Sequence, residues 1–341
     1  MGRVSSMHVL GIECTAHTFA AGIIRSEGNH MDICADVRDV YVPSKELSGI
    51  HPTEAAAHHN RVKEDAVRRA LADAQLTLPD VDILAYSAGP GLPPCLKAGV
   101  ECVTQLTEKH HTPIFAVNHP IAHIEIAKVL TGATDPIVLY VSGGNTQIIG
   151  FENGRYRVFG ETQDIPIGNA IDTFMRNVGV KGTLGGPELE QLASQGKKYI
   201  QLPYVVKGMD LSFSGILTAA TQKYAKQPGA LADLCFSFQE TCYAMLTEVC
   251  ERALAHTGKR ELLATGGVAA SQRLSAMLQS MCEQRNAHSF VCPQQYAGDN
   301  GVMIAWTGAL MHNSGAPATA NVDFFSKWRA DDADVPWMTG A

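Results

Sequence analysis

Two strand–turn–strand patterns, one in each half of the chain, constrain the fold most. Residues 9–24 and 137–149 each contain two apolar runs separated by a short turn of small and polar residues, which is typical of a β-hairpin. Gly143 and Gly144 lie in the second turn and leave its backbone free to approach a ligand closely. One hairpin per half predicts a duplicated α/β unit with a cleft between the copies. Two unrelated hairpins are the alternative.

The rest of the chain alternates helical and strand patterns, as an α/β fold requires. Residues 88–94 are too rich in proline and glycine to be predicted as helical. Asp172 falls in the first turn of its predicted helix, where the helix dipole stabilises a carboxylate. Helices are predicted over 54–74, 96–109, 119–130, 171–178, 231–256 and 302–311, and strands over 81–87, 114–117 and 262–265.

Composition limits the class of protein. A chain of 341 residues, 45% of them apolar, can bury the cores of two domains. It has no run of about 18 apolar residues and no apolar signal-peptide core, so we expect a cytoplasmic protein without a membrane partner. Residues 1–6 are polar and precede Met7, and we expect them to be a flexible or added N-terminus. Nine cysteines without a Cys-x-x-Cys pair indicate neither a disulfide framework nor a thiolate zinc site.

The net charge of −7 argues against strong binding of a polyanion by this chain alone, because Lys and Arg contacts to phosphate dominate nucleic-acid affinity. If the substrate is a nucleic acid, we expect a partner to help hold it. The helix predicted over 54–74 carries basic residues that are candidates for a partner or nucleic-acid surface, although an ordinary solvated face is the default interpretation. These residues are Arg61, Lys63, Arg68 and Arg69.

His119 and His123 are four residues apart on a predicted helix, so both imidazoles point from one face and can share a metal ion. Asn118 is suited to cap this helix and Pro120 to its first turn. The alternative is that both histidines only cap and pack the helix. A zincin peptidase needs a glutamate directly after its first histidine as general base, and Pro120 occupies that place here.

Two further loops carry ligand signals. Asp299 precedes the helix predicted over 302–311 and is either a third metal ligand or the N-cap of that helix, with capping as the default interpretation. Gly266 and Gly267 follow the strand predicted over 262–265 and give close backbone access to a ligand, although a lone Gly-Gly turn is weak evidence.

Eight ordered motifs together resemble one family over nearly the whole chain, from Met7 to about Trp337. It is the tRNA N6-adenosine threonylcarbamoyltransferase family, called TsaD in bacteria, whose archaeal and eukaryotic members are the catalytic subunit of the KEOPS complex. The first and fifth motifs have the form of the archaeal branch. The motifs span Gly11–Thr18, His51–Ala56, Ser87–Leu92, Asn118–His123, Tyr140–Thr146, Gly168–Asp172, Gly266–Ala269 and Asp299–Gly301.

The resemblance implies the duplicated actin, heat-shock and sugar-kinase ATPase fold, with two α/β lobes around a nucleotide and metal cleft. The lobes are expected over 7–132 and 133–295, and residues 296–341 would return a helix to the cleft and the first lobe before a C-terminal tail. The implied metal ligands, through which catalysis would act, are His119, His123 and Asp299, with Tyr140 added in archaeal members.

The same resemblance implies a nucleotide site. Residues on the phosphate side would be Tyr140, Val141, Ser142, Gly143 and Gly144, and those on the sugar side Asp172, Gly186 and Glu190. Ser271 stands where the family has asparagine. Serine has a shorter reach and lacks the paired donor and acceptor of an amide, so one contact to the nucleoside is expected to differ.

The implied reaction transfers threonylcarbamoyl from threonylcarbamoyl-adenylate to N6 of the adenosine next to the anticodon, in tRNAs that read codons beginning with A. A phenolate from Tyr140 would favour iron over zinc as the metal, and ATP or the adenylate would bind with or without magnesium. Implied partners are tRNA and the KEOPS subunits, namely a small kinase-like ATPase, a small dimerising protein and an accessory subunit. The alternatives are a metallopeptidase, a small-molecule kinase of the same fold, and a nucleotide-binding scaffold without catalysis.

Overall fold

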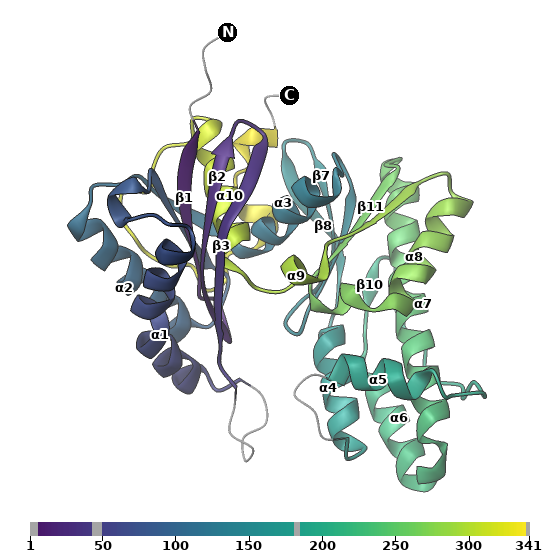
Figure 1. Ribbon diagram of the computed structural model, residues 1–341. Helices are drawn as coiled ribbons and strands as arrows, with labels where there is room; N and C mark the ends of the chain where they lie inside the picture. The colour runs from purple at the N-terminus through teal and green to yellow at the C-terminus, as the bar shows by residue number, and fades with distance from the viewer. Residues whose placement is uncertain (1–5, 43–49, 181–184, 339–341) are drawn as a thin grey trace. The chain divides into compact units, whose positions relative to one another are not determined.

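The computed structural model describes residues 6–42, 50–180 and 185–338. They form two α/β units, each with its own sheet (Figure 1). Unit 1 consists of the chain up to Ile126 and again from Asp299 onward, and unit 2 runs from Ala127 to Gly298. The C-terminal segment therefore belongs to the same unit as the N-terminus.

The sheet of unit 1 has the strand order β3-β2-β1-β4-β5. The first three strands are antiparallel neighbours, whereas β4 and β5 run parallel to β1. Helices α1 and α2 pack together on one face, and α10 packs against β1, β2 and β4. The elements are β1 (Met7–Glu13), β2 (Thr18–Glu27), β3 (His30–Val40), α1 (Pro52–Asp73), β4 (Ile83–Gly89), α2 (Pro93–Lys109), β5 (Ile114–Asn118), the start of α3 (His119–Thr131) and α10 (Gly301–Asn313).

Unit 2 repeats this topology with the strand order β8-β7-β6-β11-β12. Again three antiparallel strands are followed by two parallel ones, so the predicted duplication of an α/β unit is confirmed. The long helix α7 (Figure 1) contributes many of the buried side chains in its core. The elements are β6 (Ile137–Val141), β7 (Thr146–Glu152), β8 (Arg155–Glu161), α4 (Ile167–Asn177), α5 (Gly185–Ala193), β9 (Val206–Lys207), β10 (Asp210–Leu211), α6 (Ser214–Lys226), α7 (Leu231–Thr257), β11 (Glu261–Thr265), α8 (Gln272–Gln284), β12 (His288–Val291) and α9 (Gln294–Ala297).

Glycines let α10 lie directly on the sheet of unit 1. Gly11 and Gly22 are cross-strand partners in β1 and β2. A Cβ atom on Gly11 would lie 2.2 Å from the carbonyl oxygen of Gly301, and one on Gly22 would lie 2.3 Å from the backbone nitrogen of Val302. Neighbouring residues on the strand, such as Leu10, point to the opposite face and pack in the core with α1 and α2. The backbone contact therefore fixes the start of α10 against the sheet.

Two predicted boundaries were wrong. The sequence predicts a turn at Pro93 and Pro94, but they form the first turn of α2. The missing N–H of proline costs nothing there, because the first N–H groups of a helix have no partner within the helix. Helix α4 begins at Ile167 rather than at Ile171. Asp172 is therefore beyond the first turn, and the predicted stabilisation by the helix dipole does not apply to it.

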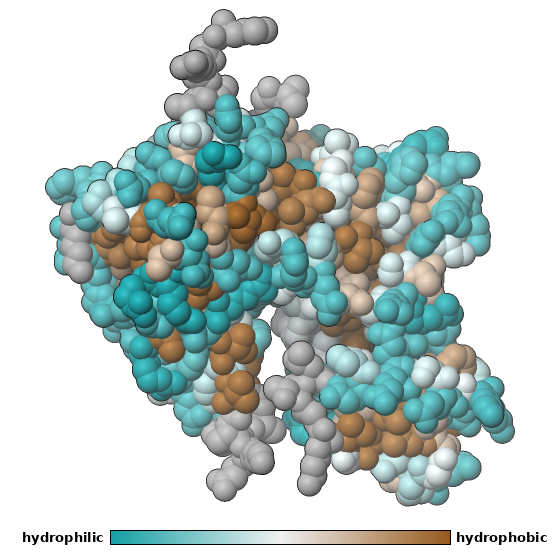
Figure 2. Space-filling model, viewed as in Figure 1, coloured by the Kyte–Doolittle hydropathy of each residue, from teal (hydrophilic) through white to brown (hydrophobic). Residues whose placement is uncertain are grey.

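The interior of the protein contains most of its cysteines. All nine cysteines are free, and all except Cys34 are buried. Among the described residues, no helix is long and apolar enough to cross a membrane. Exposed hydrophobic residues occur on unit 1 near the end of β3 (Figure 2), where Val40 and Val42 are 49% and 63% exposed. Single exposed apolar residues are common on protein surfaces and need no ligand to explain them.

The backbone contact beneath α10 leads to a first prediction. Replacing Gly22 by alanine should destabilise unit 1 by about 3 kcal/mol, because the added methyl group meets backbone atoms that cannot rotate away. Urea unfolding followed by circular dichroism measures the change. Gly229→Ala is the matched control, since its Cβ would meet open space. Equal unfolding midpoints for the two variants would contradict the contact.

Candidate metal and nucleotide sites

Three potential metal ligands converge within unit 1. His119 and His123 come from the first turns of α3, and Asp299 lies two residues before α10. Oδ1 of Asp299 is 3.6 Å from Nε2 of His119 and 3.3 Å from Nε2 of His123. The three ligand atoms lie within 4.8 Å of one another. The two rings lie together as the spacing predicted, with centroids 4.7 Å apart, and the fold brings a carboxylate to both. Metal binding by the three residues stays a prediction.

Parallel strands bring α3 to this place. β1 and β5 both run parallel to β4, so their carboxyl ends share one edge of the sheet. Asn118 ends β5 and caps α3 as predicted, because its Oδ1 accepts a hydrogen bond of 3.2 Å from the backbone N–H of Ile121. Its amide also donates to the carbonyl oxygen of Trp328 at 3.1 Å. These contacts fix the direction in which α3 leaves the sheet.

Capping was the wrong default interpretation for Asp299. Asn300 is the N-cap of α10, and its side-chain oxygen accepts a 2.8 Å hydrogen bond from the backbone N–H of Met303. Because Asn300 takes the capping position, the carboxylate of Asp299 is directed to the histidines instead. Asn300 thus caps the helix, and Asp299 lies next to the two histidines.

Glu13 orients the first histidine. This residue ends β1 and is completely buried. Its Oε1 accepts hydrogen bonds of 2.6 Å from both the backbone N–H and the hydroxyl of Thr15, and its Oε2 is 2.9 Å from Nδ1 of His119. A proton on Nδ1 leaves Nε2 as the lone-pair nitrogen that faces Asp299. A carboxylate behind a ligating histidine is the arrangement that sets its tautomer in metal sites.

The donor set fits a metal ion. Ligand atoms about 2.0–2.2 Å from one ion lie about 3.0–3.5 Å apart, so the two distances to Oδ1 of Asp299 require only a small adjustment. Two imidazole nitrogens and one carboxylate oxygen are typical ligands of iron and zinc. His17 adds a third imidazole, with Nδ1 at 3.8 Å from Oδ2 of Asp299.

The charges in this site favour exchange of a proton for a cation. Burial favours the neutral form of His119, but the charge and hydrogen bond of Glu13 raise its pKa to about 9. At His123 burial prevails and lowers the pKa. Burial opposes ionisation of Asp299, yet the imidazoles of His123 and His119 hold its pKa well below the usual range. His119 is therefore protonated at neutral pH, and a bound cation would replace that proton.

Glu13 and His17 had no role in the prediction from sequence. Both lie at the turn of the first hairpin, and the only signal was the crowding of small and polar residues there. Glu13 is separated from His119 by 106 positions, so their contact depends on the order of strands in the sheet. A carboxylate at the end of an apolar strand is the pattern that could have indicated such a role.

The predicted phosphate-side residues lie at one edge of the sheet in unit 2. Tyr140 and Val141 end β6, and residues 142–145 turn into β7. β11 runs parallel to β6 and ends at the same edge, where a Cβ atom on Gly266 would lie 2.3 Å from the carbonyl oxygen of Val141. A Cβ atom on Gly143 or Gly144 would meet no protein atom within 4 Å. The turn thus leaves space in which a ligand could approach the backbone. Whether Tyr140 ligates a metal stays a prediction; its hydroxyl accepts a 3.3 Å hydrogen bond from Asn145.

The predicted sugar-side residues form two contacts in unit 2. Asp172 on α4 accepts a 2.8 Å hydrogen bond from the backbone N–H of Gly185, the residue before Gly186 on α5. Burial raises the pKa of Asp172 despite that bond. Glu190 on α5 accepts from the hydroxyl of Ser271 at 3.3 Å and from the backbone N–H of Arg273 at 3.1 Å.

Ser271 has a structural role of its own. It is the N-cap of α8, and its oxygen accepts a 3.4 Å hydrogen bond from the backbone N–H of Leu274. The serine that replaces the family asparagine therefore both caps a helix and binds Glu190. Any contact it makes to a nucleoside stays a prediction.

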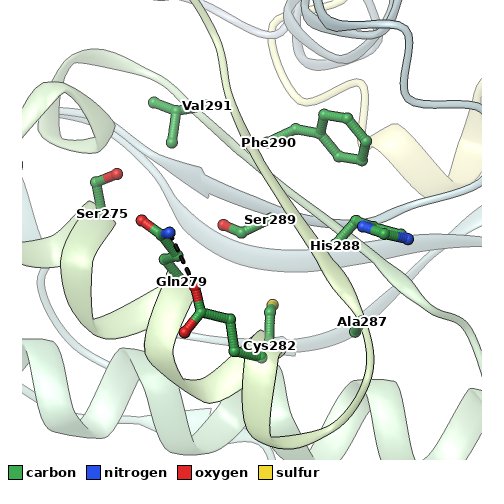
Figure 3. Close-up of a pocket in the computed structure, with 9 residues that line it drawn as sticks. Ser275, Gln279, Cys282, Ala287, His288, Ser289, Phe290 and Val291 are labelled. Carbon is green, nitrogen blue, oxygen red and sulfur yellow. Dashed lines mark hydrogen bonds between the residues drawn. The ribbon is translucent and has the colours of Figure 1, made fainter.

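A cavity elsewhere in unit 2 does not involve the predicted residues. It has a volume of about 310 Å³ and lies between α8 and β12 (Figure 3). Ser275, Gln279 and Cys282 line it from the helix, and Ser289 and Phe290 from the strand. Burial raises the pKa of the Cys282 thiol to about 11, so it is not a reactive thiolate.

Comparison with known proteins relates the chain to one family. Residues 33–306 match the family described as TsaD, tRNA N6-adenosine threonylcarbamoyltransferase. A protein of that name from Thermofilum pendens is 49% identical over 335 residues, which cover 98% of each chain. One from Thermococcus kodakarensis is 50% identical over 332 residues, covering 97% of this chain and all of the relative. A "probable bifunctional tRNA threonylcarbamoyladenosine biosynthesis protein" of Methanosarcina acetivorans is 48% identical, over 97% of this chain but 59% of the relative.

Solved structures with low sequence identity share the fold. HypF of T. kodakarensis has a TM-score of 0.62 at 12% identity, covering 93% of this chain and 49% of HypF. The activator of the 2-hydroxyisocaproyl-CoA dehydratase from Clostridium difficile, solved with bound ADPNP, has a TM-score of 0.52 at 9% identity, covering 89% and 94%. With the repeated sheet order, these similarities confirm the predicted actin, heat-shock and sugar-kinase-like ATPase fold.

The contact between Glu13 and His119 leads to a second prediction. In Glu13→Gln, the amide oxygen can still accept from Thr15, but the amide NH₂ then faces Nδ1 of His119. The ring is forced to accept there and to carry its proton on Nε2, which removes the metal-binding lone pair. Metal affinity should fall about 10- to 100-fold in competition with a chromogenic chelator. Glu240→Gln, which removes a carboxylate paired with Arg273, is the control. Unchanged affinity in Glu13→Gln would refute the orienting role.

The open space beside Gly144 leads to a third prediction. Gly144→Val should preserve the fold, because a Cβ atom there would meet no protein atom within 4 Å, and should weaken nucleotide binding at least tenfold by obstructing the backbone. Calorimetric titration with ATP measures the effect. Gly229→Val provides the control at another glycine whose Cβ would meet open space. Equal affinities in both variants would argue against a phosphate role for this turn.

Proposed function

We propose, from the premise that this chain belongs to the tRNA N6-adenosine threonylcarbamoyltransferase family, that it transfers threonylcarbamoyl from threonylcarbamoyl-adenylate to tRNA. The acceptor is N6 of the adenosine next to the anticodon in tRNAs that read codons beginning with A. The new bond joins N6 to the carbamoyl carbon, the bond from that carbon to a phosphate oxygen of the adenylate breaks, N6 releases one proton to solvent, and AMP leaves. The observation that carries the proposal is the convergence of His119, His123 and Asp299 in a member of this family.

We propose that three side chains of unit 1 hold the metal. His119 and His123 would hold it through Nε2 and Asp299 through Oδ1, while Glu13 keeps the Nδ1 proton of His119 away from the ion. When bound, the metal supplies a positive charge that can polarise a carbonyl or neutralise a phosphate. We propose iron rather than zinc, because the family resemblance adds the phenol of Tyr140 to these nitrogen and oxygen donors.

The residues of unit 2 would hold the adenylate or ATP, with or without magnesium. The backbone N–H groups of the turn at Gly143 and Gly144 are suited to the negative charge of a phosphate. Asp172, Glu190 and Ser271 would lie on the side of the sugar and base. Because Ser271 already caps α8, its hydroxyl can offer the nucleoside less than an asparagine amide would.

A metallopeptidase is disfavoured by the same geometry. Pro120 occupies the place of the zincin glutamate. Glu13 does not replace it, because it contacts Nδ1 of His119 and not the Nε2 that faces Asp299. A small-molecule kinase of this fold would have no evident use for the histidine pair.

We propose that partners complete the reaction in the cytoplasm. The Methanosarcina acetivorans relative contains the region similar to this chain within a longer protein described as bifunctional. Fusion in one organism supports association with a second activity in another. The subunits we propose are those of a KEOPS-type complex, with a small kinase-like ATPase, a small dimerising protein and an accessory subunit, which would assist a chain of net charge −7 in holding tRNA.

Removal of the metal ligands tests the proposal. The combined variant His119→Ala and His123→Ala should lose bound metal and reduce transfer of labelled threonylcarbamoyl to tRNA at least 100-fold, in an assay that supplies the adenylate-forming enzyme and the partners. Elemental analysis measures the metal. Asp299→Asn is the isosteric second variant, since it keeps the shape of the site while removing its charge. Full metal content in both variants would refute the ligand assignment, and absence of modified nucleoside with the unaltered protein would refute the transferase.

A further inference from the structure

A segment of unit 2 runs as a strap along α7. The strap consists of residues 197–207, between α5 and the end of β9. Its first two backbone N–H groups, of Lys197 and Lys198, donate to Oδ1 of Asp233 at 2.8 and 3.0 Å. The N–H of Ile200 donates to the hydroxyl of Ser237 at 2.7 Å. These contacts tie the beginning of the strap to the first turns of α7.

Two tyrosines continue the attachment further along the helix. The hydroxyl of Tyr199 is 2.8 Å from that of Thr241, and the hydroxyl of Tyr204 donates to Glu248. The anchoring positions on α7 run from Asp233 to Glu248, which corresponds to about 22 Å along a helix that rises about 1.5 Å per residue. The strap is therefore an extended surface held in place over about four turns.

The tyrosine rings are fixed but accessible. Tyr199 and Tyr204 are 50% and 49% exposed, although both hydroxyl groups are engaged by α7. Their anchors, Thr241 and Glu248, are about 10 Å apart along the helix. Two immobilised, half-exposed rings at such a separation are suited to stack on unpaired bases, and they lose little conformational freedom on doing so.

The strap carries a local excess of positive charge. The sequence from Ser194 to Met209 contains three lysines and no acidic residue. Lys197, Lys198 and Lys207 are exposed, and within the described part of the chain no ion pair joins their amines to a carboxylate. Two carboxylates lie near them: Asp233 accepts from the backbone N–H groups of Lys197 and Lys198 and attracts both amines, and Asp210 lies opposite Lys207 in the pair of strands β9 and β10. Glu248 on α7 binds Tyr204 and Arg252 instead.

We propose that the strap is a contact surface for unpaired nucleotides of the tRNA substrate, with Lys197, Lys198 and Lys207 on phosphates and Tyr199 and Tyr204 on bases. This inference rests on the proposed function for the identity of the RNA. Exposed lysines beside accessible rings match single-stranded RNA. Lysine is depleted at protein–protein interfaces, and Leu202 of the strap is 5% exposed and packs in the core, so lysines rather than aliphatic side chains surround the two rings.

Charge reversal tests the phosphate contacts. Binding of an unmodified, transcribed tRNA to the full chain is measured by fluorescence anisotropy over a series of salt concentrations. Lys197→Glu with Lys198→Glu should raise Kd about tenfold and lower the salt slope by about 1.5, because two phosphate contacts are lost. Lys223→Glu with Lys226→Glu at the end of α6 makes the same change in net charge and should leave the slope intact. Equal losses in both pairs, or no binding by the unaltered chain at low salt, would overturn the proposal.

Substitution of the rings tests stacking separately from folding. Tyr199→Phe and Tyr204→Phe keep the rings and remove the hydroxyl contacts, and both should bind tRNA within about twofold of the unaltered chain. The corresponding alanine variants should bind about tenfold more weakly. If phenylalanine weakens binding as much as alanine, the tyrosines serve only to attach the strap, and the stacking role is refuted.

The transfer assay separates this inference from the proposed function. With partners supplied, the lysine variants should raise KM for tRNA while kcat and KM for the adenylate stay unchanged, because the strap does not touch the reacting groups. An unaltered protein that binds tRNA through the strap but never modifies it would refute the function alone. Normal KM for tRNA in the strap variants, or loss of a protein subunit with tRNA binding retained, would refute the strap alone.

Discussion

The candidate metal site depends on one buried charge, the carboxylate of Glu13, which has no access to solvent. An isolated carboxylate would be very costly in such a place, so its oxygens must be satisfied. Thr15 satisfies one oxygen and the imidazole of His119 the other. Because the two nitrogens of an imidazole lie on opposite sides of a rigid ring, this contact also sets the direction of Nε2. The hydrogen bond that compensates the buried charge of Glu13 thus also orients His119 as a candidate metal ligand.

The third ligand is positioned by the backbone rather than by its own side chain. Gly11 and Gly22 allow α10 to touch the sheet, so the helix start cannot shift without a clash between main chains. Asn300 caps the N-terminus of this helix, and Asp299 directly precedes it in the chain, so the start of α10 determines where Asp299 lies. The glycines of the sheet therefore determine the position of Asp299, although they do not belong to the candidate metal site.

Patterns that act over short distances were predictable. The hairpins, the histidine pair four residues apart and the cap at Asn118 follow from local periodicity and local hydrogen bonds. The role of Glu13 was not predictable in this way, because its partner is 106 positions away and is brought near only by the order of parallel strands. Asp299 was misjudged for a related reason, since two neighbouring residues could cap α10 and only the packing of that helix decides between them. The family resemblance implied that Asp299 is a metal ligand, and the distances from its Oδ1 to His119 and His123 support that role.

The net charge of the chain does not describe how charge is distributed over its surface. The value of −7 is a sum over the whole chain, whereas salt screens the field of an exposed charge beyond about 10 Å at moderate ionic strength. On α7 the acidic groups bind backbone N–H groups, a tyrosine hydroxyl and arginines. Glu240 and Glu248 are thereby paired with arginines, whereas Asp233 still attracts Lys197 and Lys198, whose exposed amines remain accessible to a polyanion. An acidic chain can accordingly carry an RNA surface while relying on partners for most of its affinity, because the sign of the local field and the sign of the net charge are set by different residues.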